Sequence, residues 1–320
     1  MRPTLKGKVL FVFADPGGAK PCLALMEECE ADVLAISDRS APFYDDFNAK
    51  VQIANGSAVA FLKANRPDLV FTGTSYTSDL EQLYISAAKE LGILCYSFVD
   101  HWTSISKRFL NKEGKMILPN HIWVIDQRAK EMAISENIPT DKLVISGNPY
   151  HQWLAKWSPK LSKQDFLKTL EINSDLVGKN IIVYAPDPLS NVNGIDLYGF
   201  DEITATEMLI EELFANERVV RKWVILVKPH PNQDIEKLKD IVNRHPDVFL
   251  LNFGISANDA IYFADVVVGF FSSFLIEAEI IGKSVVRFIP KNLSNDPLEE
   301  LNIGVKTDSS KLIQEISKYL

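Results

Sequence analysis

Short apolar runs, each bounded by turn residues, alternate along this chain with amphipathic stretches. A run of this kind is typical of a strand buried on both faces of a parallel sheet, and the stretches between such strands are typical of covering helices. The alternation therefore predicts an α/β chain. The expected strands are Val9–Ala14, Val33–Ile36, Leu69–Thr72, Leu94–Val99, Ile122–Ile125, Val144–Ser146, Ile181–Ala185, Trp223–Val227, Val248–Leu251, Val266–Gly269 and Ser284–Phe288.

The strands fall into two sets, separated by a polar stretch over Ser158–Lys163. A chain of 320 residues is long enough for two domains, each with its own core. We therefore predict two Rossmann-like, doubly wound domains over residues 1–157 and 158–320, with ligands at the carboxyl ends of the strands, in a cleft between the domains. A helix over Ser309–Leu320 closes the chain, and the sequence leaves open whether it packs back on the first domain.

Charge and apolar content exclude several classes of protein. Lys and Arg total 34 against 42 Asp and Glu, a net charge of −8, and no basic patch is large enough to attract a nucleic acid. The most apolar late window, Ala264–Gly282, carries Asp265, Glu277 and Glu279, so it is too polar to span a bilayer unaided. We expect a cytoplasmic protein with reduced cysteines.

The strand Trp223–Val227 runs into a loop that carries a cation and an imidazole between prolines, Lys228-Pro229-His230-Pro231. Pro231 is placed to open the following helix, whose free N–H groups would attract phosphate oxygens. His230 would add a charge-assisted hydrogen bond. The alternative is a loop histidine that only caps local backbone groups.

A second anion site is indicated where the strand Val266–Gly269 leads through Phe270-Phe271 to Ser272 and Ser273 ahead of an apolar helix. Gly269 allows close backbone approach, and the serine hydroxyls and first helical N–H groups can converge on a phosphate. The alternative is an ordinary N-cap serine. Glu277, one turn into the helix, would contact a ribose hydroxyl or remain a solvated or interface carboxylate.

In the first half, Asp15 and the glycines Gly17 and Gly18 follow the first strand, and we expect them in a tight loop near ligand. Asp100 and His101 follow the strand Leu94–Val99, a carboxylate and an imidazole with general-base potential. Neighbouring residues at a strand end point apart, so only one of this pair is expected to face the cleft.

The motifs of other chemistries are missing from the sequence. It has no HExxH, no Asp-x-Asp and no clustered histidines, so we expect no metal and no cofactor. GxGxxG is absent as well, which argues against a dinucleotide site.

The Lys228-Pro229-His230-Pro231 loop and the Phe271-Ser272-Ser273 turn resemble those of GT-B fold glycosyltransferases of the bacterial HP-motif group: sialyltransferases, Kdo transferases and CDP-glycerol glycerophosphotransferases. Gly147-Asn148-Pro149 is similar to the segment that ends the first domain in this group and in UDP-GlcNAc 2-epimerases. The resemblance implies that His230, Pro231, Ser272 and Ser273 hold a cytidine nucleotide.

On this resemblance we expect a metal-independent glycosyltransferase of surface polysaccharide biosynthesis, such as capsule or lipopolysaccharide. Its second domain would bind a CMP- or CDP-linked nucleotide-sugar donor, and its first domain a glycan or lipid-linked acceptor. Association with the inner face of the membrane is left open. Asp15, or otherwise Asp100 or His101, would take the acceptor proton, and Glu202 would contact donor or acceptor from a loop unless it only begins a helix.

Two alternatives share the expected fold. A nucleotide-sugar 2-epimerase needs no second substrate, so turnover of a UDP-sugar alone would distinguish it. A non-catalytic nucleotide-sugar-binding subunit would bind nucleotide without transfer or donor hydrolysis. The Asp/Glu-Asp/Glu-Gly motif of some sialyltransferases has no counterpart here.

Overall fold

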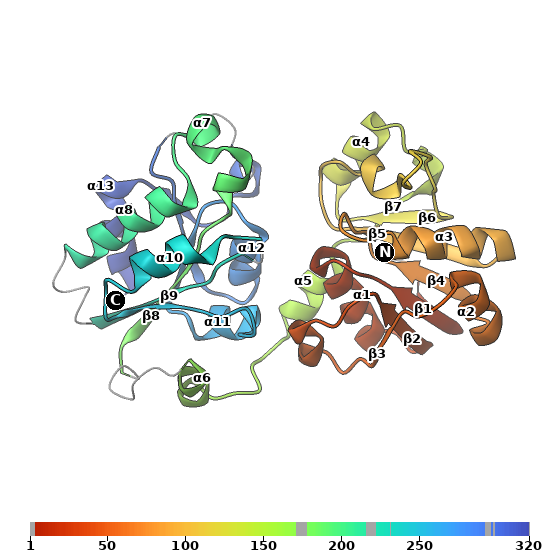
Figure 1. The fold of residues 1–320 in the computed structure, drawn as a ribbon, viewed down its shortest axis with the longest axis horizontal. Coiled ribbons are helices and arrows are strands. Elements are labelled where there is room, and N and C mark those ends of the chain that lie inside the picture. Colours follow the sequence, from red (N-terminus) through yellow and green to blue (C-terminus); the bar gives the residue numbers. More distant parts are fainter. Residues whose placement is uncertain are drawn as a thin grey trace. The chain divides into compact units, whose positions relative to one another are not determined.

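The computed structural model describes residues 4–170, 178–215, 222–230, 232–291, 296 and 298–319. Contacts divide the chain into two compact units, Met1–Trp153 and Leu154–Leu320. Within the described residues, each unit contains one sheet, and the two sheets have seven and six strands that are parallel throughout. The predicted α/β class with two Rossmann-like domains is confirmed (Figure 1).

The first unit has the strand order β3-β2-β1-β4-β5-β6-β7. Its elements are β1 (Lys8–Val12), α1 (Pro16–Glu28), β2 (Asp32–Ser37), η1 (Pro42–Asp46), β3 (Val51–Ile53), α2 (Ala58–Asn65), β4 (Leu69–Thr72), α3 (Leu80–Leu91), β5 (Leu94–Val99), η2 (Ser106–Phe109), β6 (His121–Val124), α4 (Gln127–Ser135), η3 (Thr140–Lys142), β7 (Leu143–Ile145) and α5 (Pro149–Leu154). Because the chain runs from β1 outward through β2 and β3 and then returns to β4, the order reverses between β1 and β4. This switch point is where ligands of doubly wound sheets bind.

The second unit has the order β10-β9-β8-β11-β12-β13, with its switch point between β8 and β11. Its elements are α6 (Lys163–Thr169), β8 (Asn180–Ala185), η5 (Leu189–Val192), α7 (Gly194–Tyr198), α8 (Glu202–Phe214), β9 (Trp223–Val227), α10 (Ile235–Val242), β10 (Val248–Leu250), α11 (Ala257–Phe263), β11 (Val266–Gly269), α12 (Ser273–Ile280), β12 (Ser284–Phe288), η6 (Glu299–Leu301), β13 (Val305–Thr307), α13 (Ser309–Ile316) and η7 (Ser317–Tyr319).

Alternate side chains of the second sheet enter two separate cores, as the period of a strand requires. Ile182 and Tyr184 of β8 pack with α8 and α13, whereas Ile181 and Val183 pack with α6, α11 and α12. In Figure 1, α8 and α10 lie on one side of β8 and β9, and α11 lies on the other. Leu312 of α13 is fully buried beside α8, so the last helix completes the core of its own unit.

The predicted strands are confirmed with small differences at their ends, and the structure adds two edge strands, β3 and β13. Each has three residues and is largely exposed, so neither forms the continuous apolar run that marks a buried strand.

The predicted tight loop at Gly17 and Gly18 is wrong, because both residues lie in the first turn of α1. Pro16 opens this helix at a position that needs no hydrogen-bonded N–H group. Most residues of α1 are buried, so the helix lacks the polar face that helical periodicity requires.

Candidate functional site

Two edges carry the candidate residues, one at the carboxyl end of each sheet, and each lies within its own unit. The first unit's edge is built on close contact between two backbones. An added Cβ at Gly18 would lie 2.7 Å from the Thr74 backbone nitrogen, and one at Gly73 would lie 2.8 Å from Gly18 carbon atoms. The two glycines therefore let the start of α1 touch the loop after β4.

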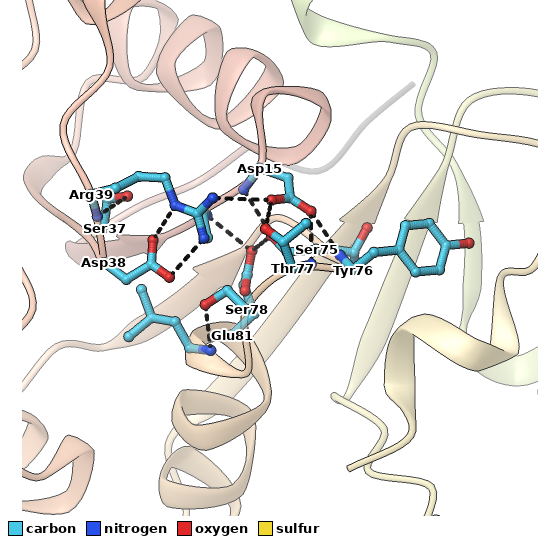
Figure 2. A network of polar contacts seen from close by, with 12 residues as sticks. Asp15, Ser37, Asp38, Arg39, Ser75, Tyr76, Thr77, Ser78 and Glu81 are labelled. Carbon is cyan, nitrogen blue, oxygen red and sulfur yellow. Dashed lines mark hydrogen bonds and ion pairs between the residues drawn. The ribbon is translucent and has the colours of Figure 1, made fainter. Parts of the chain in front are cut away.

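Asp15, the first residue predicted to be a catalytic base, binds the loop after β4 (Figure 2). Its carboxylate accepts hydrogen bonds from the Tyr76 N–H at 2.7 Å, the Thr77 N–H at 3.2 Å and the Thr77 hydroxyl. Arg39 lies 3.7 Å away and is itself held by Asp38 at 2.7 Å. Both carboxylate oxygens of Asp15 are thus engaged by the chain itself.

Glu81 lies beneath this loop and is 2% exposed. It accepts hydrogen bonds from the Ala14 N–H at 3.1 Å and from the Ser75 hydroxyl, and Ser75 Oγ accepts the Asp15 N–H at 2.9 Å. Burial raises the pKa of the Glu81 carboxyl to about 7. Sequence reasoning missed Glu81, although its spacing from Tyr84, Ile85 and Ala88 places it on the buried face of the predicted helix.

Asp100 lies against the first turn of α1 and forms an ion pair. Its Oδ1 accepts a 2.8 Å hydrogen bond from Arg108 Nη1, and a methyl group at Gly17 would overlap its Oδ2. Arg108 is 8% exposed and also donates to Thr74 Oγ1 at 3.1 Å. The carboxylate of Asp100 therefore occupies the place beside the α1 N-terminus where an anionic ligand would otherwise bind.

His101 is exposed at the same edge, and its ring is oriented by Thr103. Nδ1 accepts the Thr103 N–H at 3.2 Å, so the neutral ring carries its proton on Nε2. Partial burial of the ring lowers the pKa of the imidazole, although Asp100 acts in the opposite direction. In this tautomer Nε2 donates a hydrogen bond.

The second unit's edge contains Lys228 and His230, which follow β9 as predicted. The His230 N–H donates to Gln233 Oε1 at 3.0 Å, and the Asn232 N–H donates to His230 Nδ1 at 3.2 Å. Burial and the neighbouring Lys228 lower the pKa of His230, which favours a neutral ring with a donor at Nε2.

The helix after this loop begins with an acidic N-cap. Pro231 lies outside the described residues, and α10 begins at Ile235 with Asp234 as its N-cap, whose carboxylate accepts the Glu236 N–H at 3.1 Å. The acidic N-cap disfavours an anion here, and the phosphate contact at this helix start stays a prediction.

The turn after β11 has the predicted form. Ser272 is the N-cap of α12, its side chain makes no capping hydrogen bond, and Ser273 is the first helical residue. An added Cβ at Gly269 would lie 2.8 Å from the Ala185 carbonyl oxygen, so this glycine lets the ends of β8 and β11 meet. Glu277 is 7% exposed within α12, which excludes a solvated carboxylate.

Asp187, which sequence reasoning missed, lies directly after β8 and beside this turn. It is 9% exposed, and its Oδ2 accepts the Phe271 N–H at 3.1 Å. Burial raises the pKa of its carboxyl to about 6. Its place after a predicted strand was the available signal.

Glu202 does not lie in a ligand-contacting loop. It is 1% exposed in the first turn of α8, and its two oxygens accept hydrogen bonds from the Ser190 N–H at 2.8 Å and hydroxyl at 2.6 Å. Its function here is to fix the turn after β8.

The parts of the chain that the structure describes contain no group of three His, Cys, Asp or Glu side chains able to hold a metal ion. Among the same residues, no helix is both long and apolar enough to cross a membrane.

No protein-family model and no curated protein matches this sequence. Solved structures do match over nearly the whole chain. UDP-GlcNAc 2-epimerase from Methanocaldococcus jannaschii has a TM-score of 0.65 at 14% identity, covering 97% of this chain and 92% of that one. The Neisseria meningitidis UDP-GlcNAc 2-epimerase bound to UDP-GlcNAc has a TM-score of 0.65 at 15% identity, covering 97% and 91%. HepE from Anabaena in complex with UDP-glucose has a TM-score of 0.62 at 18% identity, covering 97% and 89%.

The two units thus have the GT-B fold of these epimerases. The expectation of a glycosyltransferase is wrong, because several of the similar structures are UDP-GlcNAc 2-epimerases and the likeness to the HP-motif transferases gains no support beyond the shared fold. The physical reason is that a strand-end histidine and a serine-capped helix suit any phosphate. Such motifs do not distinguish transfer of a sugar from its epimerisation, and the expected glycan or lipid acceptor loses its basis.

Proposed function

We propose that this protein is a nucleotide-sugar 2-epimerase acting on a UDP-sugar. The observation that carries the proposal is the near-complete correspondence of both units to 2-epimerase structures, one of them bound to UDP-GlcNAc. The carboxyl edges of both sheets support it, because each offers titratable groups where a doubly wound sheet binds its ligand.

The second unit's edge is suited to the diphosphate. Lys228 supplies a positive charge, and His230 supplies a donor at Nε2. Ser272 and Ser273 add hydroxyl groups at the start of α12. Gly269 contributes to the proposed nucleotide site through close packing of the strand ends, and Glu277 through its position in α12. Pro231, which lies outside the described residues, stays a prediction for this site.

The first unit's edge is suited to the proton transfer. Inverting C2 of a sugar requires a base to remove the C2 hydrogen as a proton. The electron pair of the broken C2–H bond forms a C1–C2 double bond as uridine diphosphate leaves C1. A proton then adds to the opposite face of C2 and uridine diphosphate returns to C1. Among the three predicted bases, Asp15 has both oxygens engaged and the neutral His101 has its proton on Nε2. Asp100 uses Oδ1 for Arg108 and places Oδ2 against Gly17 at the start of α1, and we assign this Oδ2 as the base.

The test is incubation with UDP-GlcNAc alone, followed by proton NMR of the anomeric region. The expected result is a second anomeric signal from the 2-epimer. Asp100→Asn should lower the rate by about 10²–10⁴ while UDP-GlcNAc binding persists. Asp38→Asn is the matched control at the same edge and should keep most activity, since that carboxylate serves Arg39.

A second candidate function is nucleotide-sugar binding without catalysis. It is favoured by the chain's own use of Asp15 for the loop after β4 and of Asp100 for Arg108. UDP-GlcNAc binding with no epimer after prolonged incubation would support this candidate and overturn the epimerase proposal.

A further inference from the structure

Asn232 and Gln233 engage both the backbone and the ring of His230, after the carboxyl end of β9. The His230 N–H donates to Gln233 Oε1 at 3.0 Å, and the His230 carbonyl oxygen accepts the Gln233 N–H at 2.9 Å. The Asn232 N–H donates to the ring at Nδ1, at 3.2 Å. Because Nδ1 accepts this hydrogen bond, the neutral ring carries its proton on Nε2, the ring nitrogen that remains for a ligand. The loop therefore fixes which ring nitrogen is the donor.

The Gln233 side chain is placed at a cost to the fold. It is 7% exposed, and its Nε2 has no hydrogen-bond partner among the residues that the structure describes. A buried amide with an unpartnered donor costs free energy that an apolar side chain of similar length would not. What the amide supplies is the Oε1 acceptor for the His230 N–H. The side chain is thus better explained by its hold on His230 than by packing.

Asn191, in η5 after β8, holds the same loop from a second strand. Its Nδ2 donates to the Asn232 carbonyl oxygen at 2.9 Å. That carbonyl shares a peptide group with the Gln233 N–H, which donates to the His230 carbonyl oxygen. A peptide group is planar and stiff, so engaging both of its ends fixes its orientation. The loop after β9 is therefore braced by the loop after β8.

The η5 turn that carries Asn191 is itself fixed by a buried carboxylate. Glu202 of α8 is 1% exposed and accepts the Ser190 N–H at 2.8 Å and the Ser190 hydroxyl at 2.6 Å. A series of contacts thus runs from α8 through the η5 turn and Asn232 to the His230 ring. Every member of this series lies in the second unit.

We infer that Asn191 and Gln233 are positioning residues that hold the His230 ring with its Nε2–H directed to donate to a phosphate oxygen of the nucleotide. A donor fixed before binding loses less conformational entropy when the ligand arrives, which strengthens binding. The inference rests on the proposed function, which supplies the diphosphate, and it concerns the second unit alone.

The first test needs no ligand. It is nitrogen-15 NMR of the histidine rings at pH 8, where His230 is neutral because its pKa lies below the usual value. Wild type should show His230 as the Nε2–H tautomer, with widely separated Nδ1 and Nε2 shifts. In Asn191→Ala and in Gln233→Met both tautomers should be populated, so the two shifts should move toward each other. His101, whose Nδ1 accepts the Thr103 N–H in the first unit, is the reference in the same spectra and should not change.

The second test is calorimetric titration with UDP. Each variant should raise the Kd about threefold, because one supporting hydrogen bond is lost while the ring remains. Adding Asn191→Ala to His230→Ala should weaken binding no further, because a positioning residue acts only through the ring that it positions. Val192→Ala is the matched control, since Val192 is 52% exposed in the same η5 turn, and this variant should bind UDP as wild type does. Asn191 is exposed as well, so Asn191→Ala keeps the test open should Gln233→Met fail to fold.

An unchanged His230 tautomer in Asn191→Ala would overturn the inference, and so would an unchanged Kd for UDP. Further weakening by Asn191→Ala in the His230→Ala background would overturn it as well, because Asn191 would then act on the ligand or on the fold. Failure of the wild-type protein to bind UDP would contradict the proposed function instead, and the ligand-free spectra would still decide whether these residues hold the ring.

Discussion

The carboxyl edges of the two sheets have the same topology and opposite charge arrangements. At the first edge, Asp15 caps the loop after β4 and Asp100 lies beside the start of α1. At the second edge, Lys228 and His230 follow β9, and serines lie at the start of α12. Each edge also presents a histidine whose Nδ1 accepts the N–H two residues later, His101 from Thr103 and His230 from Asn232.

The difference shows how one architecture can present unlike side chains at the same kind of switch point. At the first edge, Asp15 and Asp100 already accept hydrogen bonds from the chain's own N–H groups and from Arg108, so those donors are not available to a phosphate. The second edge supplies donors and a cation for the diphosphate. Matching histidines in unlike surroundings make this comparison open to direct tests.

The largest expected effect concerns Glu81, which is buried beneath the loop after β4 at the first edge. Its pKa of about 7 in the folded protein lies above its ordinary value of 4.5, so its ionisation destabilises the fold, and stability is lost as the pH rises from about 4.5 to 7. Relative to wild type, Glu81→Gln should therefore gain about 2–3 kcal/mol in free energy of unfolding at pH 8 compared with pH 5. Urea denaturation of wild type and Glu81→Gln at both pH values measures this gain. If the difference in free energy of unfolding between variant and wild type is the same at pH 5 and pH 8, the buried-carboxylate interpretation is refuted.

The next effect sharpens the contrast between the two histidines. His230→Ala should raise the Kd for UDP about tenfold, because a hydrogen bond to a charged phosphate is lost. His101→Ala should leave the Kd for UDP unchanged, since the first edge is not expected to bind the diphosphate. Calorimetric titration of both variants measures this. If both variants bind UDP similarly more weakly than wild type, or if His230→Ala binds it as tightly as wild type, the assignment of the diphosphate to the second edge is contradicted.

The smallest effect concerns Asp187, the carboxyl group within the otherwise anion-binding second edge. When ionised it repels a diphosphate, and its pKa is about 6, so binding of UDP-GlcNAc should tighten about threefold as the pH falls from 7 to 5. Protonation of His230, whose pKa lies below its usual value, acts in the same direction. Asp187→Asn separates the contributions of Asp187 and His230, because it removes the carboxylate and leaves only the pH dependence of affinity that His230 causes. A pH trend as steep in Asp187→Asn as in wild type would assign the whole effect to His230.

The sequence predicted the strand framework because fully buried strands such as β1, β4 and β11 are continuous apolar runs. It also placed His230 and Ser272 at strand ends, since a loop after a parallel strand must lie at the carboxyl edge. It did not predict α1, whose burial on most sides removes helical periodicity.

The interior of the candidate site was harder to predict, because its contacts join distant parts of the sequence. Asp15 binds Tyr76 and Thr77 across 61 and 62 positions, and Arg108 reaches Thr74 across 34. Local patterns carry no information on such pairs. For the same reason Asp15 was predicted to be a catalytic base, whereas its carboxylate holds a loop.

The most direct test of epimerisation is incubation of the protein with UDP-GlcNAc alone in heavy water, followed by mass and proton NMR spectra of the recovered nucleotide-sugar. Removal of the C2 hydrogen by a base, followed by deuteration from a solvent-exchanged acid and return of uridine diphosphate to C1, should place one deuterium at C2 of the recovered UDP-linked 2-epimer. Asp100→Asn should suppress the exchange. Recovery of the starting nucleotide-sugar without deuterium and without epimer would contradict the account.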